Sequence, residues 1–123
     1  MPEKKKIFVV HDHRSKQHHF DFRLQWKGSL KSWAIPKKID PKNLTSRKLA
    51  IPTENHPLSY ASFQGTIQEG YGKGTVKIWD SGEWEPISLK ENKWVFTLKG
   101  KRLKGTFVLV RFPAGWLFFK KKS

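Results

Sequence analysis

A strict alternation of apolar and polar residues between His19 and Lys27 constrains the fold more than any other feature of the chain. Apolar Phe20, Phe22, Leu24 and Trp26 alternate with polar His19, Asp21, Arg23, Gln25 and Lys27. A period of two is typical of a β-strand with one buried face, because successive side chains point to opposite sides. We therefore predict a strand that projects an imidazole, a carboxylate and a guanidinium from one face.

The residues before this strand predict its partner. Residues 7–13, IFVVHDH, are rich in β-branched and aromatic side chains, and they predict a strand that ends near His13. Residues 14–18, RSKQH, predict the loop that reverses the chain. In such a hairpin His13 lies across from His19 and Asp21, so that residues from both strands can meet.

His13, His19 and Asp21 predict a metal site. Two imidazoles and one carboxylate form a set of three ligands that leaves coordination positions open, as a catalytic ion requires. Arg23 shares their face and is a planar, bidentate donor for phosphate. The chain has no cysteine, so any ion must be bound through nitrogen and oxygen. The alternative is a solvated strand face that carries histidines by chance.

The rest of the chain predicts short strands joined by turns. Six more segments are rich in β-branched and aromatic residues and bounded by Gly, Pro, Asn or Asp: LKSWAIP (30–36), KLAIP (48–52), GTVKIWD (74–80), KWVFTLKG (93–100), GTFVLVRF (105–112) and GWLFFK (115–120). No segment carries a sustained helical stripe. We predict an all-β fold, a small closed β barrel formed by residues 1–123 as a single domain, with most phenylalanines and tryptophans in its core.

Turns and loops are predicted from composition. Lys27-Gly28-Ser29 and Asp80-Ser81-Gly82 have the composition of hairpin turns. Residues 37–48 are predicted to form a solvated loop, because Pro41 and Asn43 interrupt a strand there and five basic side chains gather in it.

The middle of the chain carries the fifth histidine, His56, four positions before Tyr60. Histidine is well suited to exchange protons or bind phosphate near neutral pH, so His56 is a candidate functional residue; the alternative is a loop histidine held by its neighbours. Three glycines around Tyr71 resemble a phosphate-cradling loop. Because no Gly-Lys-Ser/Thr follows them, a turn into the next strand is the better interpretation.

The net positive charge of the chain indicates which class of partner it binds. Lysine and arginine number 25 against 10 acidic residues, for a formal net charge of +15, which favours a polyanion and above all nucleic acid. The lysine clusters at residues 4–6 and 120–122 are expected to be frayed, electrostatic arms. The first residues lack a signal-peptide pattern and no apolar run is long enough to span a membrane, so we expect a cytoplasmic protein.

The ordered segments together resemble a known family. They are VVHDHRSKQHHFDFRL, LKSWAIPK, ENHPLSYASFQG, YGKGTVKIWDSGEWEP, LKGKRLKGTFVLVRF and WLFFKK. The series closely resembles the 3′-phosphoesterase domain of bacterial ATP-dependent DNA ligase D, which also occurs alone in some archaea and bacteria. The most specific element is His-x5-His-x-Asp-x-Arg, followed by His-Pro-Leu-x-Tyr. The resemblance covers nearly the whole chain and implies a manganese-dependent β barrel that removes a terminal ribonucleoside and then the 3′-phosphate, leaving a 3′-hydroxyl.

The resemblance also implies roles for individual residues. His13, His19 and Asp21 would bind Mn²⁺, with Zn²⁺ and Co²⁺ as further ions that fit, and Arg23 would grip the phosphate.

His56 would face that phosphate from the other side, with Tyr60 nearby. Lys37 and Lys48 would be further phosphate contacts, although relatives commonly have arginine where this chain has Lys48.

The remaining implications concern exposure, partners and alternatives. His11 stands where relatives more often have Gln or Lys, and His18 where they more often have Leu. We expect both side chains to be exposed. The partners would be 3′ ends of DNA or mixed RNA/DNA primer–templates, a ligase and a repair polymerase, with the protein acting as a monomer. Two alternatives are a non-catalytic, basic nucleic-acid-binding barrel and a non-haem iron oxygenase that uses His19, Asp21 and His56.

Overall fold

Nine antiparallel β-strands account for most of the residues that the computed structural model describes, which are 6–68, 70 and 73–122. The strands are β1 (Lys6–Arg14), β2 (His18–Trp26), β3 (Ser29–Ile35), β4 (Lys48–His56), β5 (Gly65–Ile67), β6 (Gly74–Leu89), β7 (Lys93–Lys99), β8 (Lys104–Phe112) and β9 (Gly115–Lys120). Within the described residues the one helical element is the 3-10 helix η1 (Leu58–Ser62), and no helix there is long and apolar enough to cross a membrane.

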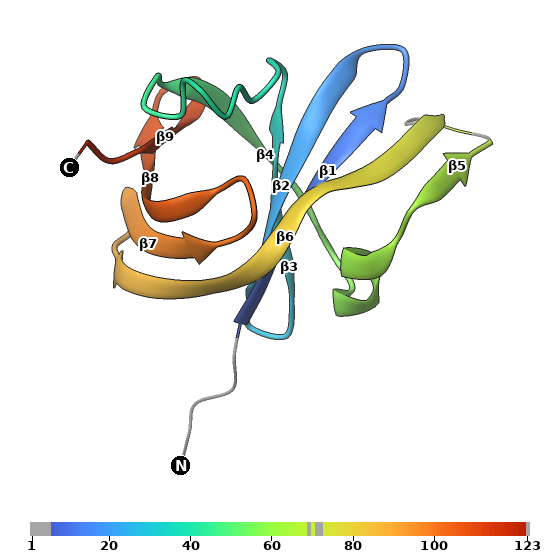
Figure 1. Cartoon of the computed structure of the whole chain (residues 1–123). Coiled ribbons are helices and arrows are strands. Elements are labelled where there is room, and N and C mark those ends of the chain that lie inside the picture. The colour runs from blue at the N-terminus through green and yellow to red at the C-terminus, as the bar shows by residue number, and fades with distance from the viewer. Residues whose placement is uncertain (1–5, 69, 71–72, 123) are drawn as a thin grey trace.

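Eight of these strands close into a barrel (Figure 1). Their order around the wall is β1-β2-β3-β4-β9-β8-β7-β6, and β6 pairs with β1 to complete the ring. The short strand β5 lies outside the ring, against the first residues of β6. The prediction of a small, closed, all-β barrel is confirmed.

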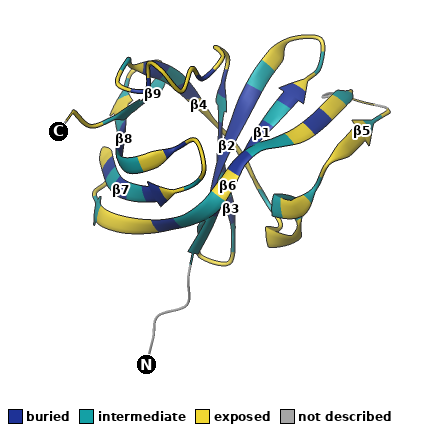
Figure 2. Cartoon of the chain, viewed as in Figure 1, coloured by how far each residue is buried: buried dark blue, intermediate teal, exposed yellow. Residues whose placement is uncertain are grey.

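Aromatic side chains fill the barrel. The core cluster contains Phe8, Phe20, Phe22, Trp33, Trp84, Trp94, Phe96, Phe107 and Phe118, and Trp26, Trp79 and Trp116 pack against it. Figure 2 shows the long buried stretch of β2 in dark blue. Most phenylalanines and tryptophans therefore belong to the core, as predicted. Because the side chains of β2 alternate between two faces, a shift of one residue in its register would exchange its phenylalanines for His19, Asp21 and Arg23.

The hairpins that carry this alternation have the predicted form. β1 and β2 pair in antiparallel register, with His13 opposite His19 and the chain reversing between Arg14 and His18. The next turn is a two-residue loop, since Trp26 pairs directly with Ser29. Its residues Lys27 and Gly28 have φ angles of 52° and 84°, the left-handed conformation that such tight hairpin loops require.

The predicted turn at residues 80–82 is wrong, because β6 continues through it. The carboxylate of Asp80 is buried and accepts three backbone N–H bonds from the turn at Lys101, Arg102 and Leu103, with lengths of 2.9, 3.1 and 2.8 Å. Gly82 serves close packing, since an added Cβ would collide with the backbone of the adjacent β7. Turn-forming residues are used here to anchor a neighbouring turn and to let two strands approach.

The loop between β3 and β4 is irregular, as predicted, but it is only partly solvated. Ile39 and Leu44 are buried in the core cluster, so this loop packs onto the barrel while its lysines stay exposed. Lys48 is the first residue of β4 and is also buried. The expectation of a fully solvated segment over residues 37–48 is therefore wrong.

Two predictions fall partly on residues that the structure leaves undescribed. Gly74 begins β6, as expected for a turn that enters a strand there. Tyr71 and Gly72 lie outside the described residues, as do Lys4 and Lys5 of the first lysine cluster.

Candidate active site

The polar residues of β1 and β2 lie on the face of the barrel wall that points away from the core. Phe20, Phe22 and Leu24 enter the core, so the alternation of β2 directs Asp21 and Arg23 outward. The segment that follows β4 covers this outer face, and Asp21 and Arg23 remain only 6% and 3% exposed. The site is therefore a buried polar layer between the barrel wall and a covering segment.

Three potential metal ligands converge in this layer. His13, His19 and Asp21 each offer one ligand atom within 4.8 Å of the others, and no further group of this kind occurs among the described residues. Oδ2 of Asp21 lies 3.5 Å from Nδ1 of His13 and 3.2 Å from Nε2 of His19. Atoms that share one ion at roughly 2.0–2.2 Å stand about 3–3.5 Å apart, so both distances fit a common ion.

His19 is oriented by the backbone of its own hairpin. Its Nδ1 lies 3.0 Å from the carbonyl oxygen of Gln17, which can only accept, so Nδ1 carries a proton and the neutral ring has its lone pair on Nε2. When the ring is protonated, Nε2 donates to Oδ2 of Asp21, and this hydrogen bond raises the pKa of His19.

The charge state of Asp21 also suits a ligand. Burial alone would raise the pKa of Asp21, but the hydrogen bond from His19 and the charge of Arg23 outweigh it and lower that pKa. The carboxyl group is therefore ionised near neutral pH, with lone pairs available to an ion.

The Arg23 guanidinium contacts four other side chains. Its Nε donates to Nδ1 of His11 over 3.0 Å, and its Nη1 donates to Oγ of Ser32 over 2.9 Å and contacts Nδ1 of His56 at 3.1 Å. Its Nη2 lies 3.3 Å from Oδ2 of Asp21. Of the five guanidinium N–H groups, these contacts leave one, on Nη2, for an incoming oxygen. In this arrangement Arg23 offers a phosphate a single donor rather than a bidentate fork.

His11 is fully buried, so the expectation that it is exposed is wrong. It accepts the bond from Arg23 at Nδ1, so its proton sits on Nε2 and is donated to the carbonyl oxygen of Phe63 over 3.1 Å. Burial, followed by the charge of Arg23, lowers the pKa of His11 to about 4, and the ring is neutral near pH 7. His11 thus joins the guanidinium to the covering segment. His18 is exposed, as expected, and forms an ion pair with Asp12.

Ser32 is a second member of this network that sequence reasoning missed. It is the cross-strand partner of Arg23 in the pairing of β2 with β3. The two-residue turn at Lys27 and Gly28 determines that pairing, so the turn composition contained the signal for it.

His56 and Tyr60 meet the other end of the guanidinium. Nδ1 of His56 lies 3.1 Å from Nη1 of Arg23 and from the carbonyl oxygen of Glu54. The Tyr60 ring stacks on His56 with 4.8 Å between centroids and lies 5.0 Å from the guanidinium carbon. Burial and then the charge of Arg23 lower the pKa of His56, while burial raises the pKa of Tyr60. The structure thus brings both residues to Arg23.

The two lysines named from the sequence are placed differently. Nζ of Lys48 donates to the carbonyl oxygens of Asn43 and Ser46 and to the Ser46 hydroxyl, at 3.1, 2.9 and 3.0 Å, which uses its three donors. Burial lowers the pKa of Lys48. Lys37 is exposed just beyond β3, at the end of the barrel where β1 turns into β2. Neither lysine is hydrogen-bonded to the cluster in the described part of the chain.

A hollow of about 340 Å³ lies where β5 pairs with the first residues of β6. It is lined by Gln64, Gly65, Thr66, Thr75, Val76 and Lys77. Val76 is the strand partner of His13, so the two side chains share a face of the β1–β6 pair. The potential ligands themselves do not line this hollow.

Comparison with known proteins adds a family and several relatives. Residues 11–111 match the model of the DNA Ligase D 3′-phosphoesterase domain. The multifunctional non-homologous end joining proteins LigD of Mycobacterium tuberculosis and Pseudomonas aeruginosa are 40% and 41% identical to the chain. That of Mycolicibacterium smegmatis is 33% identical. Each match covers 94% of this chain but only 16%, 15% and 17% of the respective relative, so the chain spans a small part of their length.

Proposed function

The chain belongs to the DNA ligase D 3′-phosphoesterase domain family, and from this premise we propose that it removes the 3′-phosphate from nucleic-acid ends to leave a 3′-hydroxyl. One observation carries the proposal: His13, His19 and Arg23 all approach the same carboxylate oxygen of Asp21. A metal-ligand set and a phosphate-binding cation are thereby built around one atom. The relatives are named for non-homologous end joining, which supports a role in that form of DNA repair.

We propose that His13, His19 and Asp21 hold the divalent ion. The mixed nitrogen and oxygen set suits Mn²⁺, and Zn²⁺ or Co²⁺ fits the same donors. A divalent ion at this position supplies a Lewis acid for a phosphoryl oxygen and lowers the pKa of a bound water. The protein contributes an ionised carboxylate and a histidine whose ring orientation is fixed by Gln17.

Arg23 would neutralise charge on the phosphoryl group during its transfer. Its guanidinium is already held by His11, Ser32 and His56, so little reorganisation accompanies the reaction. Its free N–H on Nη2 lies beside Asp21, so a phosphate at the ion would meet that donor.

His56 would act from the other end of the guanidinium. Nδ1 faces both an N–H of Arg23 and the carbonyl oxygen of Glu54, and only one of the two bonds forms in a given tautomer. In the tautomer that accepts from Arg23, the proton of the neutral ring lies on Nε2, where it can be donated to a phosphoryl or leaving oxygen. Tyr60 stacks on the His56 ring and holds its plane. We assign Lys37 to a further phosphate contact and Lys48 to the same role only if its bonds to Asn43 and Ser46 open.

The proposed substrates are DNA and mixed RNA/DNA primer–template ends. The same site would serve the removal of a terminal ribonucleoside, since that step also breaks a phosphate ester. The product, a 3′-hydroxyl, is what a DNA ligase and a repair polymerase require, so we propose both as functional partners of a monomeric protein.

A defined end tests the proposal. A 3′-phosphorylated primer–template is incubated with the protein, with Mn²⁺ or with excess chelator, and the primer end is resolved on a gel. We expect conversion to the hydroxyl form with Mn²⁺ alone, and none with the His19→Ala protein. Full activity in chelator would contradict the metal assignment, and an inert protein that binds both metal and DNA would favour the non-catalytic binding barrel.

A further inference from the structure

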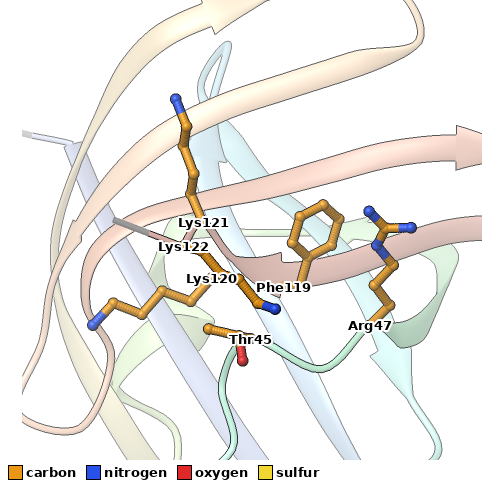
Figure 3. A pocket seen from close by; sticks show the side chains of 6 residues that line it. All are labelled: Thr45, Arg47, Phe119, Lys120, Lys121 and Lys122. Carbon is orange, nitrogen blue, oxygen red and sulfur yellow. The ribbon is translucent and has the colours of Figure 1, made fainter.

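A second basic feature lies at the end of the barrel that carries the β3–β4 loop and the end of β9. It is a hollow of about 440 Å³ lined by Thr45, Arg47, Phe119, Lys120, Lys121 and Lys122 (Figure 3). Four of these six side chains are cations and none is acidic. None of them belongs to the site around Asp21.

The hollow stands on fixed backbone. Leu44 is buried and its carbonyl oxygen accepts the backbone N–H of Lys120 over 2.8 Å, so the β3–β4 loop is tied to the end of β9. The backbone N–H of Lys121 bonds to the carbonyl oxygen of Thr106 over 2.8 Å. The bonds of Lys48 to the same loop, described above, hold it from the other side. Lys120 and Lys121 therefore project from anchored backbone, and the expectation that the lysine cluster at residues 120–122 is frayed is wrong for these two residues.

Arg47 and Phe119 contact each other within the hollow. The guanidinium carbon lies 4.9 Å from the ring centroid, and the two side chains stand next to each other in Figure 3. A guanidinium that is stacked on an aromatic face keeps its N–H groups free in the plane, in the fork geometry that matches phosphate. Thr45 also lines the hollow and carries a hydroxyl group.

Strand pairing relates the hollow to the catalytic face. Lys48, the first residue of β4, pairs with Phe118 on β9. Arg47 therefore lies just before β4 and Phe119 near the end of β9, at the barrel end where β1 turns into β2. β9 is three strands from β2 along the wall. At about 4.8 Å per strand, that separation is roughly 15 Å. The exposed lysines of the β3–β4 loop, Lys37, Lys38 and Lys42, lie on the connection between them.

We propose that this hollow binds the phosphodiester backbone of the nucleic acid whose end is processed, about four to five nucleotides from that end, at 3.4 Å per nucleotide. The location of the reacting end rests on the proposed function; the affinity of the hollow for a strand does not. The fork of Arg47, a hydroxyl and three lysines match a run of phosphates, and the net charge of +15 attracts such a chain from a distance.

Binding without catalysis gives the first test. A labelled 12-base-pair primer–template with a 3′-hydroxyl is titrated in chelator with the Arg47→Gln/Lys121→Gln protein and with Lys90→Gln/Lys93→Gln, which removes the same charge at another exposed place. We expect about tenfold weaker binding for the first variant, and a salt slope lower by about two, because two phosphate contacts are lost. Equal losses of affinity in both variants would show that the hollow contributes only non-specific electrostatic attraction, which would overturn the proposal.

Substrate length gives the second test. A dinucleotide 3′-phosphate is too short to reach the hollow, so its KM should be the same for the wild-type and Arg47→Gln/Lys121→Gln proteins. The KM of the 3′-phosphorylated 12-base-pair substrate should rise about tenfold in the variant, with kcat unchanged. An equal rise for both substrates would overturn the proposal. If neither substrate turns over, the proposed function fails. The binding titration still decides whether the hollow binds the nucleic-acid strand.

Discussion

Two arginines of this chain cover an aromatic ring at nearly the same distance, in very different surroundings. The guanidinium carbon of Arg23 lies 5.0 Å from the Tyr60 ring centroid, and that of Arg47 lies 4.9 Å from the Phe119 centroid. Arg23 is buried among bonds to four other side chains, whereas Arg47 is exposed at the rim of a lysine-lined hollow. The ring contact alone thus says little about what an arginine does.

The two guanidinium charges are stabilised differently, by protein side chains at Arg23 and by solvent at Arg47. A buried cation must be paired and hydrogen-bonded, and the carboxylate of Asp21 and the neutral rings of His11 and His56 satisfy that requirement for Arg23. An exposed cation is solvated and needs no such network. We therefore expect changes at Arg23 to alter turnover, and changes at Arg47 to alter affinity.

Replacing each arginine with lysine should give the largest difference in kcat between the two regions. Lysine keeps the charge but has three donors on a single nitrogen, which cannot span the four side chains that the guanidinium contacts. Arg23→Lys should therefore lower kcat by roughly 10²–10³, the usual effect of losing one preorganised donor. Arg47→Lys serves as the matched control and should leave kcat unchanged. Steady-state kinetics on a 3′-phosphorylated primer–template measure both. Equal, small effects on kcat would remove the distinction between the two regions.

His56→Ala should produce the next largest loss. Removing a group that exchanges a proton or stabilises the transferred phosphate typically lowers the rate by about 10² or more. Because His56 contacts Arg23 and not the three potential ligands, bound Mn²⁺ should stay near the wild-type amount. Turnover and metal content are measured on the same preparation. A parallel loss of metal would show that His56 supports metal binding, contrary to the role proposed for it.

His11→Ala should cost stability. It leaves Nε of Arg23 and the carbonyl oxygen of Phe63 without their partner in a buried layer, and an unsatisfied buried group costs about 1–3 kcal/mol. His18→Ala, at an exposed position of the same hairpin, is the control and should be nearly neutral. Urea unfolding gives both free energies. A His11→Ala protein as stable as the control would show that the covering segment does not depend on this bond.

The smallest effect is a shift in a titration. Burial, and then the charge of Arg23, lowers the pKa of His56 below 6.5. The ring is therefore neutral near pH 7 and becomes protonated as the pH falls below 6.5. Removing the charge in Arg23→Gln should move that pKa upward, which NMR titration of the His56 ring in the metal-free protein detects. An unchanged or lower pKa would mean that the two groups are not coupled.

The alternation of β2 and its pairing with β1 were predictable because both depend on local pattern. A period of two, bounded by a tight loop on each side, was enough to place His13 opposite His19 and to direct Asp21 and Arg23 to one face. The fold class followed from the same kind of signal repeated along the chain.

Features that depend on distant segments were not predictable in this way. His11 is buried because the carbonyl of Phe63, 52 residues away, folds over it, and nothing in β1 indicates that contact. Asp80 and Gly82 have turn-forming side chains, but their partners lie in β7 and the turn after it, so composition alone misplaced them.

Metal binding by the isolated protein decides whether the outer face of β1 and β2 is a metal site or merely an ion-pair network. Equilibrium dialysis against Mn²⁺, with the bound ion counted by mass spectrometry, should give one ion per wild-type chain, none for His19→Ala and one for His56→Ala. A wild-type protein that binds no ion, or a His19→Ala protein that binds it as tightly as the wild type, would show that His13, His19 and Asp21 do not form a metal site.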